Sequence, residues 1–345
     1  MAKGLIEIAL QLGSKLGANT SKFLGTRSNV SFLGTGPKDG MLFQKPINPE
    51  SFATIGIEKV IPDIESSLAY ATGGKLNDIE LSTLIKNLKT MEAYVTIDKQ
   101  ENGLATIEFF HPKHNSLPSD ILKKLADTIT AAGEDEAVKV IILKSGGDRT
   151  FCAGASFDEL ISINDFPTGK EFFMGFARVI NACRKCPKFI IGRVQGKAVG
   201  GGVGVASAVD YCLATKFASV KLSELNIGIG PFVVSPAVQR KIGLSAMSQM
   251  TINADQFYSA DWAESKGLYA DVFEDAESLD HGVQELANYL LSKNPEAQKE
   301  LKKVFWSDCE DWDQKLEQRA ELSGRLVLSE YTKSILAISD SIYLR

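Results

Sequence analysis

Within residues 94–109, apolar and polar positions tend to alternate in two runs, which is the pattern of half-buried strands. Two such runs, residues 94–98 and 104–109, stand on either side of Glu101-Asn102-Gly103. Asn-Gly between alternating runs is a strong signal for a tight turn, because both residues tolerate a positive φ. The pattern therefore predicts a β-hairpin at the start of this region.

Beyond the hairpin, segments with helical spacing of apolar residues alternate with apolar runs of strand length. Apolar residues recur at helical spacing over residues 118–132 and about 170–184, whereas residues 138–143 and 189–194 are apolar runs of strand length. Continuous apolar strands are typical of a sheet that is covered on both faces. The order strand, helix, strand, helix predicts an α/β fold with a buried sheet.

The two ends of the chain differ from this middle part. Beyond about residue 245 the pattern is mostly helical and amphipathic, from Ser259 through Tyr331. Residues 1–90 are punctuated by glycine and asparagine, with helical spacing at residues 56–70 and 78–88. We therefore predict a small separate N-terminal segment at residues 1–90 and a larger domain at residues 91–345.

Composition and charge limit the classes of function. The chain has 345 residues, 44% of them hydrophobic and 23% charged, so a sizeable core is available. A formal net charge of -5 supplies no general attraction for nucleic acid or for an anionic membrane. No stretch reaches the length of a membrane-spanning helix, and no cleavage site of a secretory leader follows the apolar N-terminal residues. We expect a cytoplasmic protein that binds neither nucleic acid nor membrane.

Five scattered cysteines do not suggest a disulfide framework. Cys183 and Cys186 form a C-x-x-C pair, but a zinc site would need a second pair or histidines at usable spacing. We therefore predict no metal site and two reduced thiols on a helix face, with a redox pair as the alternative.

Three segments contain candidates for chemistry, and the first is Phe151-Cys-Ala-Gly-Ala-Ser156. Its small residues, Ala153, Gly154 and Ala155, would let a backbone N–H face a ligand without obstruction by a side chain. A tight strand-to-helix connection would use the same residues, so both interpretations are open for this segment alone.

The second segment contains three consecutive glycines, Gly200, Gly201 and Gly202. Glycine loses more conformational entropy on folding than other residues, so the run indicates a need for bare backbone. Small and apolar residues follow at 203–209 and predict a tightly packed helix, whose first N–H groups could stabilise an oxyanion. Neither nucleotide-binding glycine pattern fits, since Lys197 precedes the glycines and Ser207 stands where a further glycine is needed. A flexible turn beside a closely packed helix is the alternative.

The third segment places Glu224 after a strand-like alternation and before Gly228, Gly230 and Pro231. A carboxylate at the edge of an apolar, glycine-rich pocket would have its pKa raised by desolvation, which suits proton transfer near neutral pH. An ordinary solvated glutamate is the alternative, because most of the 43 acidic residues are of that kind.

Taken together, the three segments resemble the enoyl-CoA hydratase/isomerase (crotonase) superfamily, over residues 91 to about 335. The resemblance implies a spiral of repeated ββα units with C-terminal helices that help to build trimers, often paired into hexamers. It also implies that the N–H groups of Ala155 and Gly201 form an oxyanion hole and that Glu224 is the acid/base. The implied reaction stabilises a thioester enolate.

The resemblance also identifies a binding region for the coenzyme. His111-Pro-Lys-His-Asn-Ser-Leu117 looks like the family segment that holds the coenzyme A end of the substrate. The implied binding residues are Lys113, His114, Asn115, Ala153, Gly154, Gly200 and Gly202. An acyl-CoA is then the ligand, coenzyme A enters as part of the substrate, and no permanently bound cofactor is expected.

The chain departs from the family pattern at two positions. Gly204 stands where well-known hydratases have a first glutamate, which favours double-bond isomerisation, although decarboxylases and hydrolases of this fold also lack it. Phe232 stands where some members have a further acid, which weakens the hydroxyacyl-CoA hydrolase and dienoyl-isomerase interpretations; Asp158 and Glu159 are candidate substitutes. The apolar residues 232–234 suggest core packing, with a bulky acyl pocket as the alternative.

Residues 1–90 resemble no family that we can name. A natural segment for assembly or for binding a protein partner and a foreign piece fused in front of a complete enzyme are both open interpretations. If residues 1–90 serve assembly or partner binding, a further interpretation is a catalytically weak scaffold that displays this segment.

Overall fold

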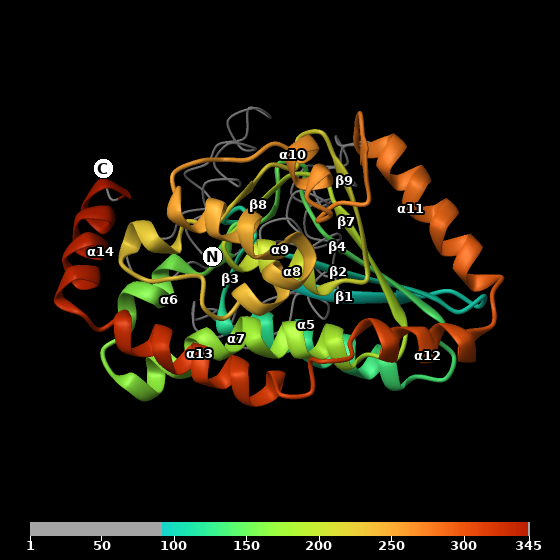
Figure 1. Ribbon diagram of the computed structural model, residues 1–345, viewed down its shortest axis with the longest axis horizontal. Coiled ribbons are helices and arrows are strands. Elements are labelled where there is room, and N and C mark those ends of the chain that lie inside the picture. The colour runs from blue at the N-terminus through green and yellow to red at the C-terminus, as the bar shows by residue number, and fades with distance from the viewer. Residues whose placement is uncertain (1–91, 344–345) are drawn as a thin grey trace, which may run out of the picture. The chain divides into compact units, whose positions relative to one another are not determined.

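The computed structural model describes residues 92–343 of the 345-residue chain. The predicted helices at residues 56–70 and 78–88 lie outside the described residues, and the separateness of residues 1–90 stays a prediction. Described residues form an α/β fold with a long C-terminal series of helices, as the pattern predicted (Figure 1).

The central element is a six-stranded sheet in the order β1-β2-β4-β7-β9-β11. Its strands are β1 (Tyr94–Lys99), β2 (Leu104–Phe110), β4 (Val140–Ser145), β7 (Phe189–Val194), β9 (Tyr211–Thr215) and β11 (Asp271–Phe273). β1 and β2 form the predicted antiparallel hairpin, with Gly103 at a φ of +96°, and the remaining neighbours are parallel. Parallel neighbours need crossover connections, which explains the helices between them.

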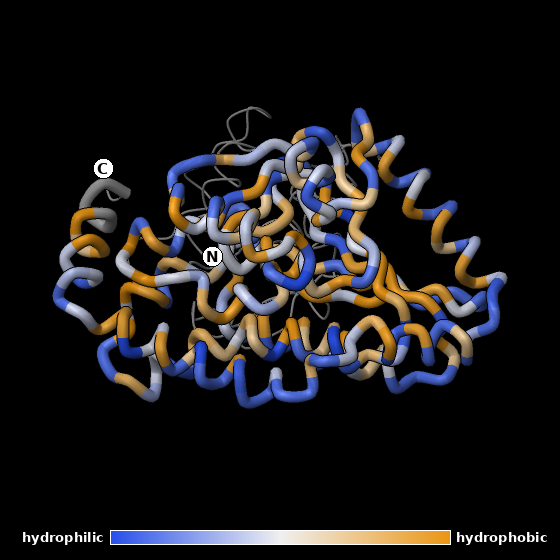
Figure 2. The backbone as a smooth tube through the Cα atoms, in the orientation of Figure 1, coloured by the Kyte–Doolittle hydropathy of each residue, from blue (hydrophilic) through white to orange (hydrophobic). Residues whose placement is uncertain are grey.

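Both faces of the sheet are buried, which explains the uninterrupted apolar run in β4. Ile141 and Leu143 belong to a large core that also contains residues of α5 (Ser119–Glu134) and α7 (Phe166–Lys185). Val140 and Ile142 point to the other face, where α11 (Ala276–Leu291) covers the sheet. Figure 2 shows the strands as largely hydrophobic, whereas the outward turns of α13 (Trp312–Leu326) are largely hydrophilic.

Two smaller sheets bring distant segments together beside the large one. β5 (Thr150–Cys152) and β10 (Val220–Lys221) both pair in parallel with β8 (Lys197–Val199). β3 (Ser116–Leu117) pairs in parallel with β6 (Gly154–Ala155). α6 (Phe157–Ser162) follows β6, and α8 (Gly201–Ala208) follows β8. The small sheets therefore join all the segments that the sequence analysis singled out.

The C-terminal part is helical, but one strand interrupts it. The helices are α9 (Ser235–Ile252), α10 (Ala260–Ser265), α11, α12 (Pro295–Phe305), α13 and α14 (Glu330–Tyr343). The strand, β11, has three residues and adds to the edge of the large sheet beside β9. A run this short carries no recognisable period, so the sequence pattern missed it.

The structure agrees with the expected thiol chemistry of the cysteines. Cys183 lies in α7 and Cys186 caps its C-terminal end, and both are free and buried. Burial raises the pKa of the Cys183 thiol to about 12. No helix within residues 92–343 is long and apolar enough to cross a membrane.

Candidate active site

The first and second segments lie side by side. Gly154 in β6 has a φ of +94°, and a Cβ built on it would lie 3.3 Å from the carbonyl oxygen of Val199 and 3.7 Å from the nitrogen of Gly201. A side chain at residue 154 would therefore stand between the two strands of backbone. Because residue 154 is glycine, the next residue, Ala155, can approach the start of α8.

Three consecutive glycines form the junction between β8 and α8. Gly200 has φ +53° and ψ -115°, a conformation that glycine adopts without steric cost. α8 begins at Gly201, two residues earlier than the predicted helix. The N–H of a helix's first residue has no intrahelical partner, and it lies at the positive end of the helix dipole.

Close neighbours explain why residues 201 and 202 have no side chains. A Cβ on Gly201 would lie 2.3 Å from the ring of Phe176, and a Cβ on Gly202 would lie 2.4 Å from the carbonyl oxygen of Cys152. Such distances are far below contact, so the helix could not pack in this position with larger residues. The glycines thus fix the location of the first turn of α8.

Ala155, the other expected donor, is held by its neighbours on both sides. Its carbonyl oxygen accepts a hydrogen bond of 2.8 Å from the hydroxyl of Ser116 in β3. The next residue, Ser156, is the N-cap of α6, and its hydroxyl accepts from the N–H of Glu159. These bonds restrict the backbone directly before and after Ala155.

Glu224 is the first residue of a 3-10 helix, η2 (Glu224–Ile227), and the strand before it is only two residues long. A Cβ on Gly200 would lie 2.9 Å from its Oε1 atom, so the carboxyl group rests against the bare backbone of the glycine junction. Its Oε2 atom is buried and has no hydrogen-bond partner within the part of the chain that the structure describes. Burial raises the pKa of Glu224 to about 7, while hydrogen bonds from the backbone of Glu224 and Ser223 act in the opposite direction.

The segment at residues 111–117 separates into an inward part and an outward part. His114 and Asn115 both have positive φ, of 54° and 55°. Lys113 and His114 are exposed, and Lys113 forms an ion pair with Asp158. Asn115 is 2% exposed, and its amide is hydrogen-bonded to backbone groups of the protein. Asn115 was expected among the coenzyme-binding residues, but the bonds of its side chain hold loops together.

The two acids considered as substitutes for a missing carboxylate have other partners. Asp158 is paired with Lys113, as described above. Both oxygens of Glu159 accept hydrogen bonds from the N–H of Ser119, where α5 begins. Within the described residues, Asp158 and Glu159 are therefore each already engaged by another group of the protein.

Gly204, where the first glutamate of the family pattern would stand, is closed by packing. A Cβ built on Gly204 would lie 2.4 Å from Cγ1 and 2.8 Å from Cβ of Val234. Val233 and Val234 are buried in the large core, so the apolar run at 232–234 is core packing at these two positions. The sequence showed that the glutamate is absent, but it did not show that a valine fills its space.

Comparisons with known proteins cover most of the described part of the chain. The family model described as "Enoyl-CoA hydratase/isomerase" matches residues 99–335. A short-chain-enoyl-CoA hydratase from Clostridium acetobutylicum is 30% identical over 249 residues, which cover 71% of this chain and 94% of the relative. A peroxisomal Delta(3,5)-Delta(2,4)-dienoyl-CoA isomerase from Arabidopsis thaliana is 27% identical over 262 residues, covering 70% and 92%.

Solved structures show the same fold. The crystal structure of an enoyl-CoA hydratase from Bacillus halodurans superposes with a TM-score of 0.67 at 22% identity, covering 71% of this chain and 99% of that one. An enoyl-CoA hydratase from Mycobacterium avium gives a TM-score of 0.64 at 25% identity, with coverage of 73% and 98%. The predicted crotonase-like α/β fold with C-terminal helices is confirmed.

Proposed function

Because the chain belongs to the enoyl-CoA hydratase/isomerase family, we propose that it shifts a double bond within an enoyl-CoA thioester, with Glu224 as its single acid/base. The observation that carries this proposal is the buried Oε2 atom of Glu224, which has no hydrogen-bond partner among residues 92–343. A buried carboxyl oxygen without a hydrogen bond is costly, so the arrangement is best explained by a bound substrate that supplies a partner.

The backbone donors would stabilise the charge that develops during the reaction. The thioester carbonyl oxygen accepts the N–H groups of Ala155 and Gly201, and removal of a proton from the adjacent carbon places negative charge on that oxygen. Each donor then contributes about 3–4 kcal/mol to stabilising the transition state, as in acyl-transfer enzymes. The positive end of α8 acts in the same direction.

Glu224 would move the proton. Its carboxylate takes a proton from the carbon next to the thioester carbonyl, and the electron pair of that C–H bond forms the enolate. The protonated Glu224 then returns the proton to the carbon at the far end of the former double bond, which restores the carbonyl. A pKa near 7 suits both directions of transfer near neutral pH.

The surroundings of Gly204 support isomerisation over hydration. Val234 fills the space next to Gly204, and Asp158 and Glu159 are bonded elsewhere. A second carboxyl group to share the activation of water is therefore lacking at these positions. Hydration by Glu224 alone is the second candidate, because the relative from Clostridium acetobutylicum is a hydratase.

Product analysis by mass spectrometry tests the proposal. Enzyme incubated with 3-enoyl-CoA and 2-enoyl-CoA esters should give isomers of unchanged mass, whereas hydration adds the mass of water. Glu224→Gln should slow turnover by about 10²–10⁴, the usual contribution of a positioned acid or base. Glu171→Gln is the control, since Glu171 pairs with Arg178 on the surface of α7. Unchanged turnover in Glu224→Gln would remove the proposed base.

Several expectations from the sequence stay predictions. They are assembly into trimers or hexamers, a cytoplasmic location, contacts of Lys113 and His114 with coenzyme A, and a partner-binding role for residues 1–90. Coenzyme A as part of the substrate is consistent with the family.

A further inference from the structure

We propose that two buried amides, those of Asn115 and Gln195, are positioning residues that set the location of the Ala155 N–H. They do so by holding the loop at residues 145–150 from two sides. The inference rests on the proposed function, because it concerns the same oxyanion hole. Neither amide is explained by the reaction itself.

Asn115 holds one side of the loop. Its Nδ2 atom donates to the carbonyl oxygens of Gly146 (2.9 Å) and Thr150 (2.8 Å), and its Oδ1 atom accepts from the N–H of His111 (2.7 Å). Its carbonyl oxygen accepts from the N–H of Ala153, two residues before Ala155. All of these partners are backbone groups, so the amide fixes chain positions and not side-chain orientations.

Gln195 holds the other side, from the end of β7. Its Nε2 atom donates to the Ser145 hydroxyl (2.9 Å) and to the carbonyl oxygens of Gly147 (3.1 Å) and Thr150 (3.4 Å). The loop passes so close that a Cβ on Gly196 would lie 2.3 Å from the carbonyl oxygen of Arg149. Residues 195 and 196 together therefore support the loop along most of its length.

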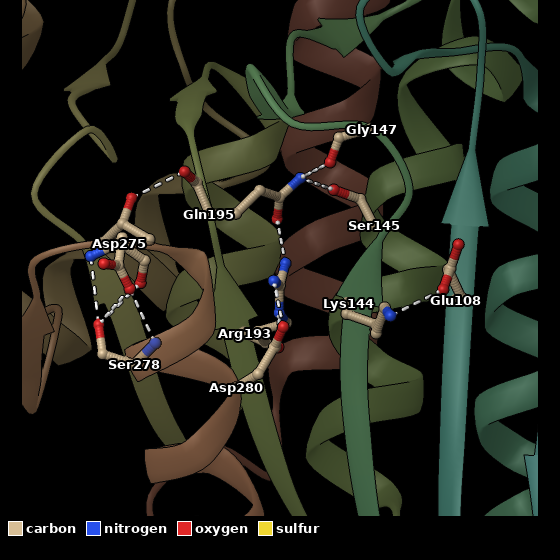
Figure 3. Close-up of polar contacts among 10 residues, drawn as sticks. Glu108, Lys144, Ser145, Gly147, Arg193, Gln195, Asp275, Ser278 and Asp280 are labelled. Atoms are coloured by element: carbon tan, nitrogen blue, oxygen red, sulfur yellow. Dashed lines mark hydrogen bonds and ion pairs between the residues drawn. The ribbon is translucent and has the colours of Figure 1, made fainter.

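Gln195 is itself oriented by a chain of polar contacts. Its Oε1 atom accepts from Nη1 of Arg193 (3.3 Å), and Arg193 forms an ion pair with Asp280 of α11 (Figure 3). The hydroxyl of Thr215 donates to the Gln195 carbonyl oxygen (2.7 Å). Because Arg193 can only donate, it fixes Oε1 toward itself and leaves Nε2 to face the loop.

The two amides converge on the carbonyl oxygen of Thr150, five residues before Ala155. From that point the chain runs directly through β5 and Ala153 into β6, so a displacement of Thr150 is transmitted to the donor. Removing the Asn115 amide takes the donor from the buried carbonyl oxygen of Gly146, and removing the Gln195 amide takes the donor from the Ser145 hydroxyl and the Gly147 carbonyl oxygen. Thr150 then keeps one of its two amide donors, and the loop is free to shift toward that side. An oxyanion hole depends on donors within a few tenths of an ångström of the developing charge.

The thioester carbonyl itself reports the geometry of the hole. An oxyanion hole polarises the bound carbonyl and lowers its infrared stretching frequency. We would bind a saturated acyl-CoA with a ¹³C-labelled carbonyl to wild-type protein, to Gln195→Met and to Asn115→Ser. Both variants should show a smaller frequency shift, and kcat should fall by about 10–10³ with KM nearly unchanged, because a full oxyanion donor is worth about 10²–10³.

A matched control is available in Gln298→Met. Gln298 is also a buried amide that donates to a backbone carbonyl, that of Leu290, but it joins α12 to α11. It should lose less stability than Gln195→Met, because its Oε1 atom has no hydrogen-bond partner among the described residues, and it should keep the wild-type frequency shift. If Gln195→Met does not fold, Ser145→Ala removes one of its partners and should give a smaller change in the same direction.

Two different results would overturn the inference, and they can be told apart. If the wild-type protein shows no frequency shift, the proposed oxyanion hole fails and the inference fails with it. If the wild type shows the shift and the variants keep it in full, together with their kcat, then the hole stands and the two amides have no positioning role.

Discussion

Two glycines of the α8 segment, Gly200 at its start and Gly204 one turn into the helix, lack a side chain for different reasons. Gly200, the N-cap of α8, has a positive φ and places bare backbone against the carboxyl group of Glu224. One turn later, Gly204 is glycine because Val234 of the neighbouring core occupies the position of its side chain. The first position lies beside the proposed acid/base, while the second is closed by packing.

This difference separates two properties of the proposed enzyme. Stabilisation of a thioester enolate depends on the start of α8, where backbone donors and Glu224 meet. In the proposed reaction, the number of carboxyl groups available depends on position 204, where a valine fills the place that the family pattern gives to a glutamate. A core contact between α8 and the residues just before α9 therefore favours one reaction class over another.

Of the alanine substitutions at Gly200 and Gly204, Gly200→Ala should have the larger effect on catalysis. At φ +53° an alanine is strained, and its Cβ would lie 2.9 Å from Oε1 of Glu224. We expect kcat to fall by about 10²–10³, as for loss of an oxyanion donor. Steady-state kinetics on 3-enoyl-CoA measures it.

Gly243→Ala is the control for backbone strain alone. Gly243 also has a positive φ, of +76°, but nothing lies within 4 Å of a Cβ there. The strain costs about 1–3 kcal/mol in each variant. Equal kcat losses in the two variants would show that strain, and not the contact with Glu224, is responsible.

The pH dependence of the reaction tests the role of Glu224 beside the start of α8. Glu224 must be ionised to take a proton, and burial raises its pKa to about 7. We expect kcat/KM to rise about tenfold per pH unit below pH 7 and to level off above it. The profile of the free enzyme measures this pKa, and a midpoint near the ordinary value of 4.5 would contradict the burial of the carboxyl group.

The ionisation of Glu224 should also affect the stability of the fold. Here a rise in pH should lower the free energy of unfolding. The folded protein binds the Glu224 proton more tightly than the unfolded chain, so the contribution is fully present below about pH 4.5 and is lost as pH rises through about 7. The loss amounts to about 3 kcal/mol. Measured by urea unfolding across this range, the stability of the wild type should fall relative to that of Glu224→Gln by this amount, while other groups such as His111 titrate in both proteins.

Gly204→Ala should have the smallest effect on catalysis and a clear effect on stability. Its Cβ would overlap Val234, which costs about 1–3 kcal/mol in an overpacked core. Val234→Ala creates the space, so the double variant should be more stable than the sum of the single changes predicts, by about 0.5–3 kcal/mol. Denaturant unfolding measures the coupling, and additive effects would argue against the contact.

Gly204→Glu extends this test to the reaction. With Val234 in place, the new carboxylate has no room at its proper position, so hydration of 2-enoyl-CoA should not appear. Strong hydratase activity in this single variant would mean that Val234 moves readily to admit a side chain at position 204.

Much of the fold was predictable because long apolar runs and strong turn signals act locally. Asn102-Gly103 indicated the hairpin, and the run in β4 indicated a sheet buried on both faces. β11 was not predictable, because a three-residue strand is held by the edge of β9 and not by its own sequence. The start of α8 was placed two residues late, since glycine has low helix propensity and only packing overrides it.

The sequence alone determined which residue types were available: bare backbone at residues 200–202 and 153–155, one glutamate at position 224, and no glutamate at position 204. Only the tertiary structure decided that these backbones adjoin, that Oε2 of Glu224 is buried without a partner among the described residues, and that Val234 fills the empty place. It also turned Asn115 inward, to hold a loop. Burial and contact depend on residues far apart in the chain, and no local pattern encodes them.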